Sequence, residues 1–275
     1  MSHYHGIDFV EWNAGQAIDA HMTSEGFHVH AWVDKTNGLV HGGNEWNCGT
    51  WMDKMGSAMT NKGVPATPRY GAAVEINGIA LRVLEFFVGR LNRSELGSWY
   101  ALLKQHFGKL FFADGIVKDV IGGDPVEESR FRPNACIALA KVPLGTVDAD
   151  AARAYLKKCD ESLRGPLGMR TLPSTDPAYN GVYDNSDETA GYNYHNGPEW
   201  VWLFGYFIIA CNRFDVFTQD QMIQMVEQHE LHIRRDSWRS LPELTNFNGH
   251  MCPFSCPAQA WSVCCLLEAI SNFRK

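Results

Sequence analysis

Apolar residues recur at helical spacing through most of the chain, and polar stretches rich in glycine and proline separate the runs. The spacing predicts helices over residues 74–91, 94–111, 149–163, 199–214, 218–234 and 257–273, and a short apolar segment over 135–142. Ser94, Asp148 and Thr218 each stand at the start of a run, where an N-cap side chain would satisfy free backbone N–H groups. The run at 199–214 is apolar on nearly every side, which predicts a helix buried all round.

The stretches between these helices are unusually long. Residues 43–56, 61–72, 114–130, 166–197 and 241–256 mix glycine, proline, amide and aromatic side chains without a regular period. Loops of this length inside a folded domain are usually functional. Near the start, the pattern predicts only a short helix near 14–22 and a strand over 27–33. Helices alternating with long loops predict one all-α domain over residues 1–275, an α/α toroid with its chemistry at the loop end.

Composition narrows the classes of function. Of the 275 residues, 45% are hydrophobic, enough for a sizeable core, and the net charge is −7 without a basic cluster, which argues against a nucleic-acid partner. No apolar run approaches the roughly 20 residues that cross a bilayer, so no membrane association is expected. The eight cysteines do not form a disulfide framework, and the first residues lack the pattern of a signal peptide, so we expect reduced thiols and a cytoplasmic location.

Metal and cofactor motifs are weak. Cys252 and Cys256 are not followed by a histidine pair at zinc-site spacing, and His28, His30 and His41 have no carboxylate at a convincing distance along the chain. The sequence contains no phosphate loop, dinucleotide fingerprint or nucleophile elbow. We therefore expect neither a metal nor a cofactor.

Residues 43–56 carry the richest local chemistry. Trp46 and Trp51 offer flat apolar faces, and Asn44, beside Asn47 and Thr50, offers hydrogen bonds. This mixture suits a sugar, whose rings have apolar faces and hydroxyl edges. The alternative is a glycine-rich loop whose tryptophans only fill the core.

Three loops carry groups that could transfer protons. The first loop carries Asp53, the second carries His195 and Glu199, and the third carries Glu243. Two carboxylates on separate loops are what glycoside hydrolysis needs, one to protonate the leaving oxygen and one to activate water. A cap role for Asp53 and a surface position for Glu243 remain equally open from the residues alone. Further candidates for contacts with a sugar are Arg132, Asn134, His195, Asn196 and Trp200, whereas core packing is favoured for Trp202.

Six ordered blocks resemble one known family. They are NEWNCGTWMDKMG at 44–56, PATPR at 65–69 with AVEI at 73–76, RPN at 132–134, YHNGPEW at 194–200, LPELTN at 241–246 and QAWS at 259–262. Together they resemble the C-terminal amylo-α-1,6-glucosidase domain of eukaryotic glycogen debranching enzymes, from about Gly6 to the end of the chain.

The resemblance implies an (α/α)6 toroid of the six-hairpin glycosidase type. It implies a hydrolase that removes the α-1,6-linked glucose at a glycogen branch stub, with inversion and without a metal. Asp53 matches the general acid and Glu243 the general base, and Arg69 joins the candidate substrate-binding residues. Such an acid should hold its proton in a partly desolvated pocket, while Glu243 holds a water. Inversion further implies carboxyl groups roughly 6.5–9.5 Å apart.

Three departures from the family pattern matter. Tyr70 stands where an acidic residue usually follows Pro-Arg, and the segment between Ile76 and Arg132 looks short. The predicted helices are too few for a closed toroid, so we expect an N-terminally truncated chain with exposed apolar helix faces. Full-length relatives carry an upstream 4-α-glucanotransferase domain. The alternatives are a non-catalytic glycogen-binding or interaction fragment, and another α/α toroid of the terpenoid-cyclase type, whose aspartate-rich metal motifs are missing.

Overall fold

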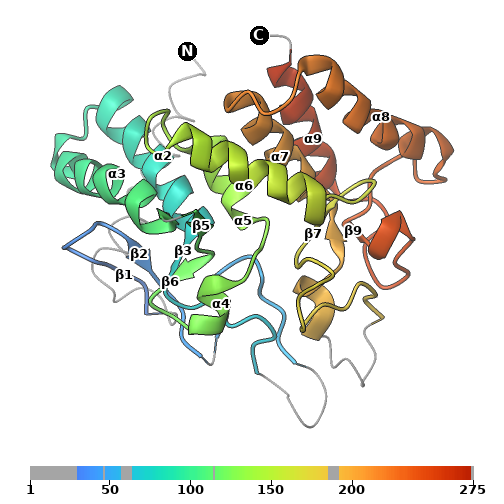
Figure 1. The fold of residues 1–275 in the computed structure, drawn as a ribbon, viewed down its shortest axis with the longest axis horizontal. Helices are drawn as coiled ribbons and strands as arrows, with labels where there is room; N and C mark the ends of the chain where they lie inside the picture. Colours follow the sequence, from blue (N-terminus) through green and yellow to red (C-terminus); the bar gives the residue numbers. More distant parts are fainter. Residues whose placement is uncertain (1–29, 46, 57–63, 114, 185–191, 274–275) are drawn as a thin grey trace, which may run out of the picture.

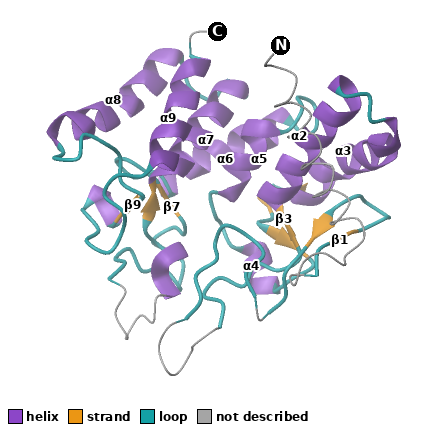
Figure 2. Ribbon diagram, turned by 180° about the vertical axis from the view of Figure 1, so that it is seen from behind, coloured by secondary structure: helices purple, strands orange, loops and turns teal. Residues whose placement is uncertain are grey.

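The computed structural model describes residues 30–45, 47–56, 64–113, 115–184 and 192–273. Within this part, the long helices gather on one side of the molecule, and the long loops with their short strands and the short helix α4 gather on the other (Figures 1 and 2). The helix predicted near 14–22, the first residues of the strand predicted over 27–33, and Trp46 lie outside the described residues. No helix in the described ranges is long and apolar enough to cross a membrane.

The observed helices follow the predicted apolar runs closely. They are α2 (Val74–Arg90), α3 (Gly97–Phe111), α4 (Pro125–Ser129), α5 (Asn134–Lys141), α6 (Ala149–Ser162), α7 (Val201–Arg213), α8 (Gln219–Arg235) and α9 (Ala260–Asn272), with single 3-10 turns η1 (Ser94–Leu96), η2 (Tyr192–His195) and η3 (Phe247–Gly249). Two predicted boundaries are wrong. The run at 94–111 begins with η1, and Ser94 does not cap α3. The run at 199–214 becomes helical only at Val201, because Glu199 and Trp200 pair with neighbouring strands.

Two predicted N-caps are confirmed. The Asp148 carboxylate accepts hydrogen bonds from the backbone N–H groups of Asp150 (3.0 Å) and Ala151 (2.9 Å) at the start of α6. Thr218 and Gln221 form a reciprocal capping box at the start of α8. The Thr218 hydroxyl accepts from the Gln221 N–H at 3.3 Å, and the Thr218 N–H donates to the Gln221 side chain at 2.8 Å.

We expect Thr218→Ala to lower the free energy of unfolding by about 1 kcal/mol, because the substitution removes one acceptor for the free N–H groups of α8. Urea unfolding followed by circular dichroism measures this loss. Thr175→Ala is the matched control, since Thr175 is an exposed loop residue. Equal stability of the two variants would show that the capping box does not stabilise the fold.

The helices pack as two layers. α2, α5, α7 and α9 form a row in which each helix packs against the next, and α3 and α6 lie outside α2 and α7. Close approach within the row requires glycine. A Cβ at Gly78 of α2 would lie 2.6 Å from the Cα of Ala138 in α5, and one at Gly205 of α7 would meet the carbonyl oxygen of Cys265 in α9. Because α7 has neighbours on all sides, its apolar residues are buried all round, as predicted.

The strands of the described ranges are each only two residues long. β1 (Trp32–Val33) pairs with β2 (Val40–His41), β3 (Ala72–Ala73) with β6 (Val120–Ile121), and β4 (Phe112–Ala113) with β5 (Ile116–Val117). A three-stranded antiparallel sheet orders β7 (Met169–Arg170), β8 (Glu199–Trp200) and β9 (Leu244–Thr245). This last sheet joins two of the long loops in front of the helices.

The all-α prediction therefore needs correction: the fold is dominated by helices but carries four small sheets in the described ranges. Those ranges contain seven helices of eight residues or more, and they do not form a closed ring of twelve. Apolar side chains lie exposed on helices at both ends of the row. Phe86 of α2 is 49% exposed and Leu267 of α9 is 59% exposed, as expected where no further helix covers these faces.

Candidate active site

Tyr194 connects the two candidate catalytic carboxylates. Its side chain lies near Glu243 and within the electrostatic reach of Asp53, and both carboxylates act on its hydroxyl. Burial, followed by the interaction with Glu243, raises the pKa of Tyr194 well above its usual range. The tyrosine therefore stays neutral, with a hydroxyl that can donate a hydrogen bond. Two loops that lie far apart in the sequence thus meet around one phenol.

Glu243 is held firmly by the segment that leads into α9. Its backbone N–H donates to the carbonyl of Cys256 at 2.9 Å, and its own carbonyl accepts from the N–H of Val201 at 3.2 Å. Its carboxylate accepts from the Cys256 N–H at 3.3 Å and from the Gln259 side-chain amide at 3.2 Å. Together with Tyr194, these donors fix the direction of a half-buried carboxylate.

Asp53 lies in a different environment. The preceding Met52 is fully buried, and the Lys54 ammonium lies 5.9 Å from the centre of the Tyr183 ring and 5.7 Å from that of Tyr194. These two neighbours anchor the backbone on either side of Asp53. The Asp53 residue itself is exposed, so the partly desolvated pocket expected for it is not present in the described part of the chain.

An aromatic cluster lies directly behind these residues. The Trp51 ring meets the rings of His195, Trp200 and Trp202 edge-on, with centroid distances of 5.1, 5.2 and 4.9 Å. The Trp200 indole N–H donates to the carbonyl of Tyr194 at 2.9 Å. Trp200 and Trp202 are both buried, so the core role expected for Trp202 is confirmed, and Trp200 has no open face for stacking on a sugar.

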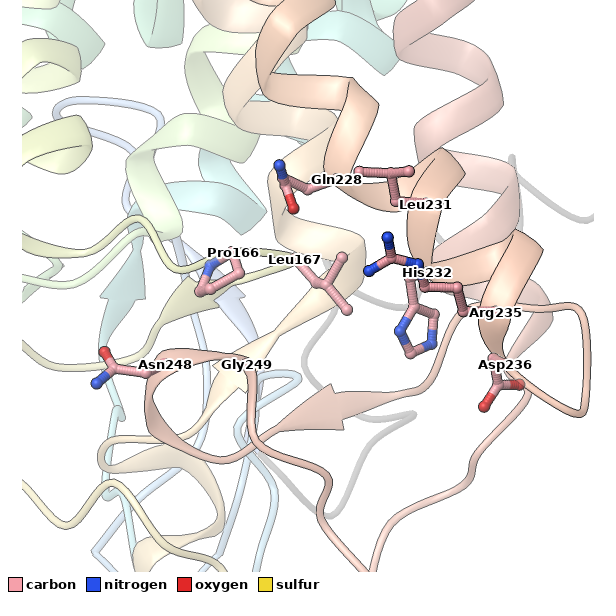
Figure 3. A pocket seen from close by; sticks show the side chains of 9 residues that line it. All are labelled: Pro166, Leu167, Gln228, Leu231, His232, Arg235, Asp236, Asn248 and Gly249. Atoms are coloured by element: carbon pink, nitrogen blue, oxygen red, sulfur yellow. The ribbon is translucent and has the colours of Figure 1, made fainter.

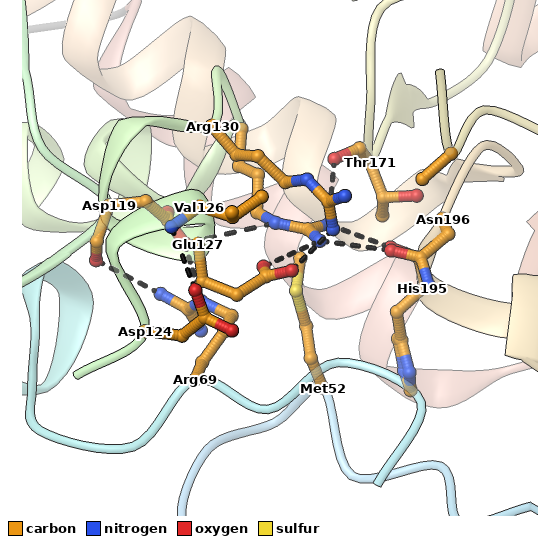
Figure 4. A network of polar contacts seen from close by, with 12 residues as sticks. Met52, Arg69, Asp119, Asp124, Val126, Glu127, Arg130, Thr171, His195 and Asn196 are labelled. Carbon is orange, nitrogen blue, oxygen red and sulfur yellow. Dashed lines mark hydrogen bonds and ion pairs between the residues drawn. The ribbon is translucent and has the colours of Figure 1, made fainter. Parts of the chain in front are cut away.

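Arg69 and Arg132 form a buried network of charges beneath the loops (Figure 4). Arg69 pairs with Glu75 at 2.6 Å and with Asp119 at 2.5 Å. Although burial opposes its charge, Asp119 and Glu75 raise the pKa of Arg69 above its usual range. Arg132 pairs with Glu127 at 3.0 Å. Both guanidinium groups are therefore neutralised inside the protein rather than turned toward a ligand.

The network reaches the catalytic loops through two branches. Arg132 donates to the carbonyl of His195 at 2.9 Å and to the side chain of Asn196 at 2.9 Å. In the other branch, the Asn134 amide donates to Asp119 at 2.9 Å and its oxygen accepts from the Trp51 indole at 2.9 Å. Each branch ends close in the sequence to Tyr194 or Asp53.

His195 is almost fully buried. Its ring stacks on Trp200 with a centroid distance of 5.0 Å, and neither ring nitrogen has a hydrogen-bond partner among the described residues. Burial, assisted by the charges of Arg132 and Arg69, lowers the pKa of His195 well below its usual range. The imidazole is therefore neutral at physiological pH.

Four of the residues predicted to bind substrate are buried, so the prediction is corrected for them. The side chains of Arg69, Arg132, Asn134 and His195 lie inside the protein, so none of them can contact a sugar hydroxyl in this structure. Asn44 and Trp51 are half-buried and remain at the loop surface.

Glu199, the third candidate carboxylate, is structural in this arrangement. It is completely buried and accepts hydrogen bonds from Thr245 (3.1 Å) and from the backbone N–H groups of Asn248 (2.9 Å) and Gly249 (3.1 Å). Burial raises the pKa of Glu199, and the nearby Arg170 opposes that shift.

Across the described residues, no group of three or more histidine, cysteine, aspartate or glutamate side chains could hold a metal ion.

Comparison with known proteins identifies the family. The family model described as amylo-alpha-1,6-glucosidase matches residues 2–268. The chain belongs to the amylo-α-1,6-glucosidase family. Glycogen debranching enzyme of Saccharomyces cerevisiae is 37% identical to it over 326 aligned positions, which cover 97% of this chain and 21% of the yeast protein. The aligned span exceeds the 275 residues of the chain, so the yeast protein has insertions relative to it.

Solved structures support the fold of this amylo-α-1,6-glucosidase family member. A GH63 mannosylglycerate hydrolase from Thermus thermophilus, solved with glucose, superposes with a TM-score of 0.53 at 14% identity, covering 75% of this chain and 46% of that one. An uncharacterized conserved protein from the same organism also gives 0.53 at 14% identity, covering 74% and 47%. At this identity the likeness concerns the fold alone.

The sequence analysis did not select three residues that the structure places in the site. Tyr194 and Gln259 fall within the blocks that carry the family resemblance, and Lys54 follows Asp53 directly. Their positions in those blocks were the available signal. Their roles depend on contacts with Glu243 and with the Tyr183 and Tyr194 rings, which only the folded chain brings together.

Proposed function

We propose that this chain hydrolyses the α-1,6-linked glucose at branch stubs of glycogen or a related α-glucan, with inversion. The observation that carries the proposal is the placement of Asp53 and Glu243, from separate loops, around Tyr194: Lys54, next to Asp53, lies 5.7 Å from the Tyr194 ring centre, and Tyr194 in turn interacts with Glu243. Membership of the amylo-α-1,6-glucosidase family and the likeness to a yeast glycogen debranching enzyme support the substrate class.

In this mechanism Asp53 is the general acid and Glu243 the general base. Glu243 removes a proton from a water molecule as the water oxygen attacks the anomeric carbon. The bond from that carbon to the glycosidic oxygen breaks, its electron pair stays on the oxygen, and Asp53 supplies the proton to it. The products are β-glucose and a chain without its stub.

The surroundings of Glu243 suit its role, whereas those of Asp53 do so only once substrate is bound. Tyr194, Gln259 and the Cys256 N–H hold the Glu243 carboxylate in one orientation, which pre-positions the base. Asp53 is exposed, and a general acid works best where water is excluded. We therefore propose that the bound glucan supplies the desolvation of Asp53, with Asn44 and Trp51 at the sugar.

The direct test is incubation with a maltooligosaccharide that carries one α-1,6-linked glucose, followed by proton NMR of the released sugar. We expect β-glucose to appear first and to mutarotate later. Initial release of α-glucose would overturn the inverting arrangement. A folded chain that releases no glucose would overturn the hydrolase proposal and favour the glycogen-binding alternative.

Tyr194→Phe is expected to lower kcat about ten- to a hundredfold with little change in KM, because the polar interaction of its hydroxyl with the proposed base Glu243 is lost while contacts with the substrate remain. Steady-state kinetics on the branched oligosaccharide separates the two constants. Tyr100→Phe on α3 is the control, since its hydroxyl accepts a hydrogen bond from the exposed Lys104 ammonium at 3.4 Å, away from the candidate site. A rise in KM at unchanged kcat would show that Tyr194 binds substrate instead.

The cellular setting is also proposed rather than observed. The chain spans about a fifth of the yeast protein. We propose that it works beside a 4-α-glucanotransferase domain that trims branches first, in the cytoplasm. Purification of the native protein from cells, with its covalent mass and location recorded, tests both points.

A further inference from the structure

A hollow of about 380 Å³ lies between the β4–β5 hairpin and α6, two elements that are side by side in Figure 1. None of the proposed catalytic or substrate-binding residues lines it. Its lining is mostly apolar, with rings from Phe112, Phe131 and Tyr155 and aliphatic side chains from Ile116 and Val117. The volume and the apolar lining are those of a small-molecule site.

The aromatic wall of this hollow is held in place by the protein itself. The Tyr155 ring meets the Phe131 ring edge-on at a centroid distance of 5.5 Å and the Phe112 ring at 6.3 Å. The Tyr155 hydroxyl donates to the carbonyl of Arg132 at 2.6 Å, and Phe112 pairs with Val117 across the hairpin. The wall is therefore formed before a ligand arrives, which lowers the entropic cost of binding.

The remaining lining favours a hydrocarbon chain. Ile116 is 58% exposed, and Ala151 and Ala154 give the α6 side of the hollow two small apolar side chains. The Ser129 hydroxyl, which also lines the hollow, already donates to the carbonyl of Val126 at 3.2 Å. A saturated chain needs no hydrogen-bond partner, and it would cover apolar surface that is now open to water.

Lys158 adds a single positive charge to this lining. Among the described residues that line the hollow, it is the one with a charged side chain. Its ammonium lies 4.3 Å from the centre of the Phe131 ring, and no carboxylate pairs with it in the described part of the chain. Because Lys158 is exposed, its charge lies at the solvent edge of an apolar hollow. This arrangement complements a ligand with one anionic end and an apolar tail.

The hollow between α8 and the η3 turn lacks this division between a charged edge and an apolar interior (Figure 3). Its lining carries His232 and Arg235 together with the opposite charge of Asp236. Charges of both signs oppose the selection of an apolar anion there. The complementarity is therefore specific to the hollow beside α6.

We propose that the hollow between the β4–β5 hairpin and α6 binds a medium-chain fatty acid. The hydrocarbon tail lies among the rings of Phe112, Phe131 and Tyr155, and the carboxylate lies beside the Lys158 ammonium. A volume of about 380 Å³ suits one chain of roughly eight to ten carbons. The proposal goes beyond hydrolysis of a glucan and does not depend on it.

The probes are hexanoate, octanoate and decanoate, each below its micelle concentration, and octanol, which has the octanoate chain length without the charge. The readout is NMR titration of the backbone amides of residues 151–158. Lys158→Met removes the charge and keeps an apolar side chain over Phe131. Lys157→Met is the matched control, because Lys157 is exposed on the same helix and does not line the hollow. Ala154→Phe fills the hollow from an exposed position, and circular dichroism confirms that each variant is folded.

We expect the fatty acids to shift these amides, with an affinity that rises about fourfold for each added methylene group. Lys158→Met should weaken octanoate binding at least fivefold and leave octanol binding unchanged, while Lys157→Met changes neither. Ala154→Phe should abolish binding of both. The site is overturned if decanoate causes no shifts in the parent, if the two lysine variants lose affinity equally, or if Ala154→Phe binds octanoate as the parent does.

Discussion

Glu243→Gln is expected to reduce glucose release from the branched oligosaccharide by about 10²–10⁴-fold, the usual contribution of a general base. The amide keeps the size of the side chain and can still occupy the position beside Gln259 and the Cys256 N–H. It cannot accept a proton from water. Stopped assays of released glucose at saturating substrate measure the loss directly.

Substrate affinity should survive this change, because the proposed role of Glu243 is proton transfer. Binding of the intact branched oligosaccharide by calorimetry should differ from the parent by no more than about threefold, well under 1.4 kcal/mol. Glu161→Gln, an exposed carboxylate on α6, serves as the control and should retain full activity. Turnover close to that of the parent in Glu243→Gln, or loss of binding together with turnover, would remove Glu243 from its assigned role.

Asp119→Ala is expected to destabilise the fold by about 3–5 kcal/mol, because it leaves buried cations without their partner. Asp119 lies 2.5 Å from Arg69 and 3.9 Å from Arg132, and it also accepts from the Asn134 amide. Few surrounding groups can replace these contacts, since the site is closed to water. Urea unfolding gives the loss, provided that the variant remains folded without denaturant.

Glu230→Ala is the matched control for Asp119→Ala. It breaks an exposed i,i+4 ion pair with Arg234 on α8, and such pairs contribute about 1 kcal/mol or less. If the two variants lost similar stability, the buried network would not be what holds the catalytic loops on the helices. A variant of Asp119 that is too unstable to purify is compared as Asp119→Asn, which keeps the volume and should fall between parent and Asp119→Ala.

The helices were predictable because each buries one face at a fixed period. α2 and α8 end within one residue of their predicted limits, and the Asp148 and Thr218 caps need only local backbone partners. The errors arose where distant pairing competes with local preference. The apolar pattern predicted that Glu199 and Trp200 begin a helix. They form β8 instead, because they pair with Met169–Arg170 on one side and with Leu244–Thr245 on the other. Two-residue strands have no period to detect.

In the candidate site, too, some features were predictable from the sequence and others were not. Asp53 and Glu243 were candidates from their residue type and loops and took the acid and base roles from the family resemblance, and the structure places both near Tyr194. The buried state of Arg69 and Arg132 was not predictable, because arginine is mostly exposed and is buried only when partners neutralise it. Those partners, Glu75, Asp119 and Glu127, are ordinary acidic residues in the sequence.

The sequence by itself determined the helical segments, the long loops between them and the family to which the chain belongs, because periodic burial, capping and residue identity are local properties. Only the tertiary structure decided which polar residues face outward. It turned Arg132 and His195 inward, joined Tyr194 to Glu243 and left Asp53 exposed. These outcomes depend on contacts between segments far apart in the chain, and their free energy exists only once the chain has folded.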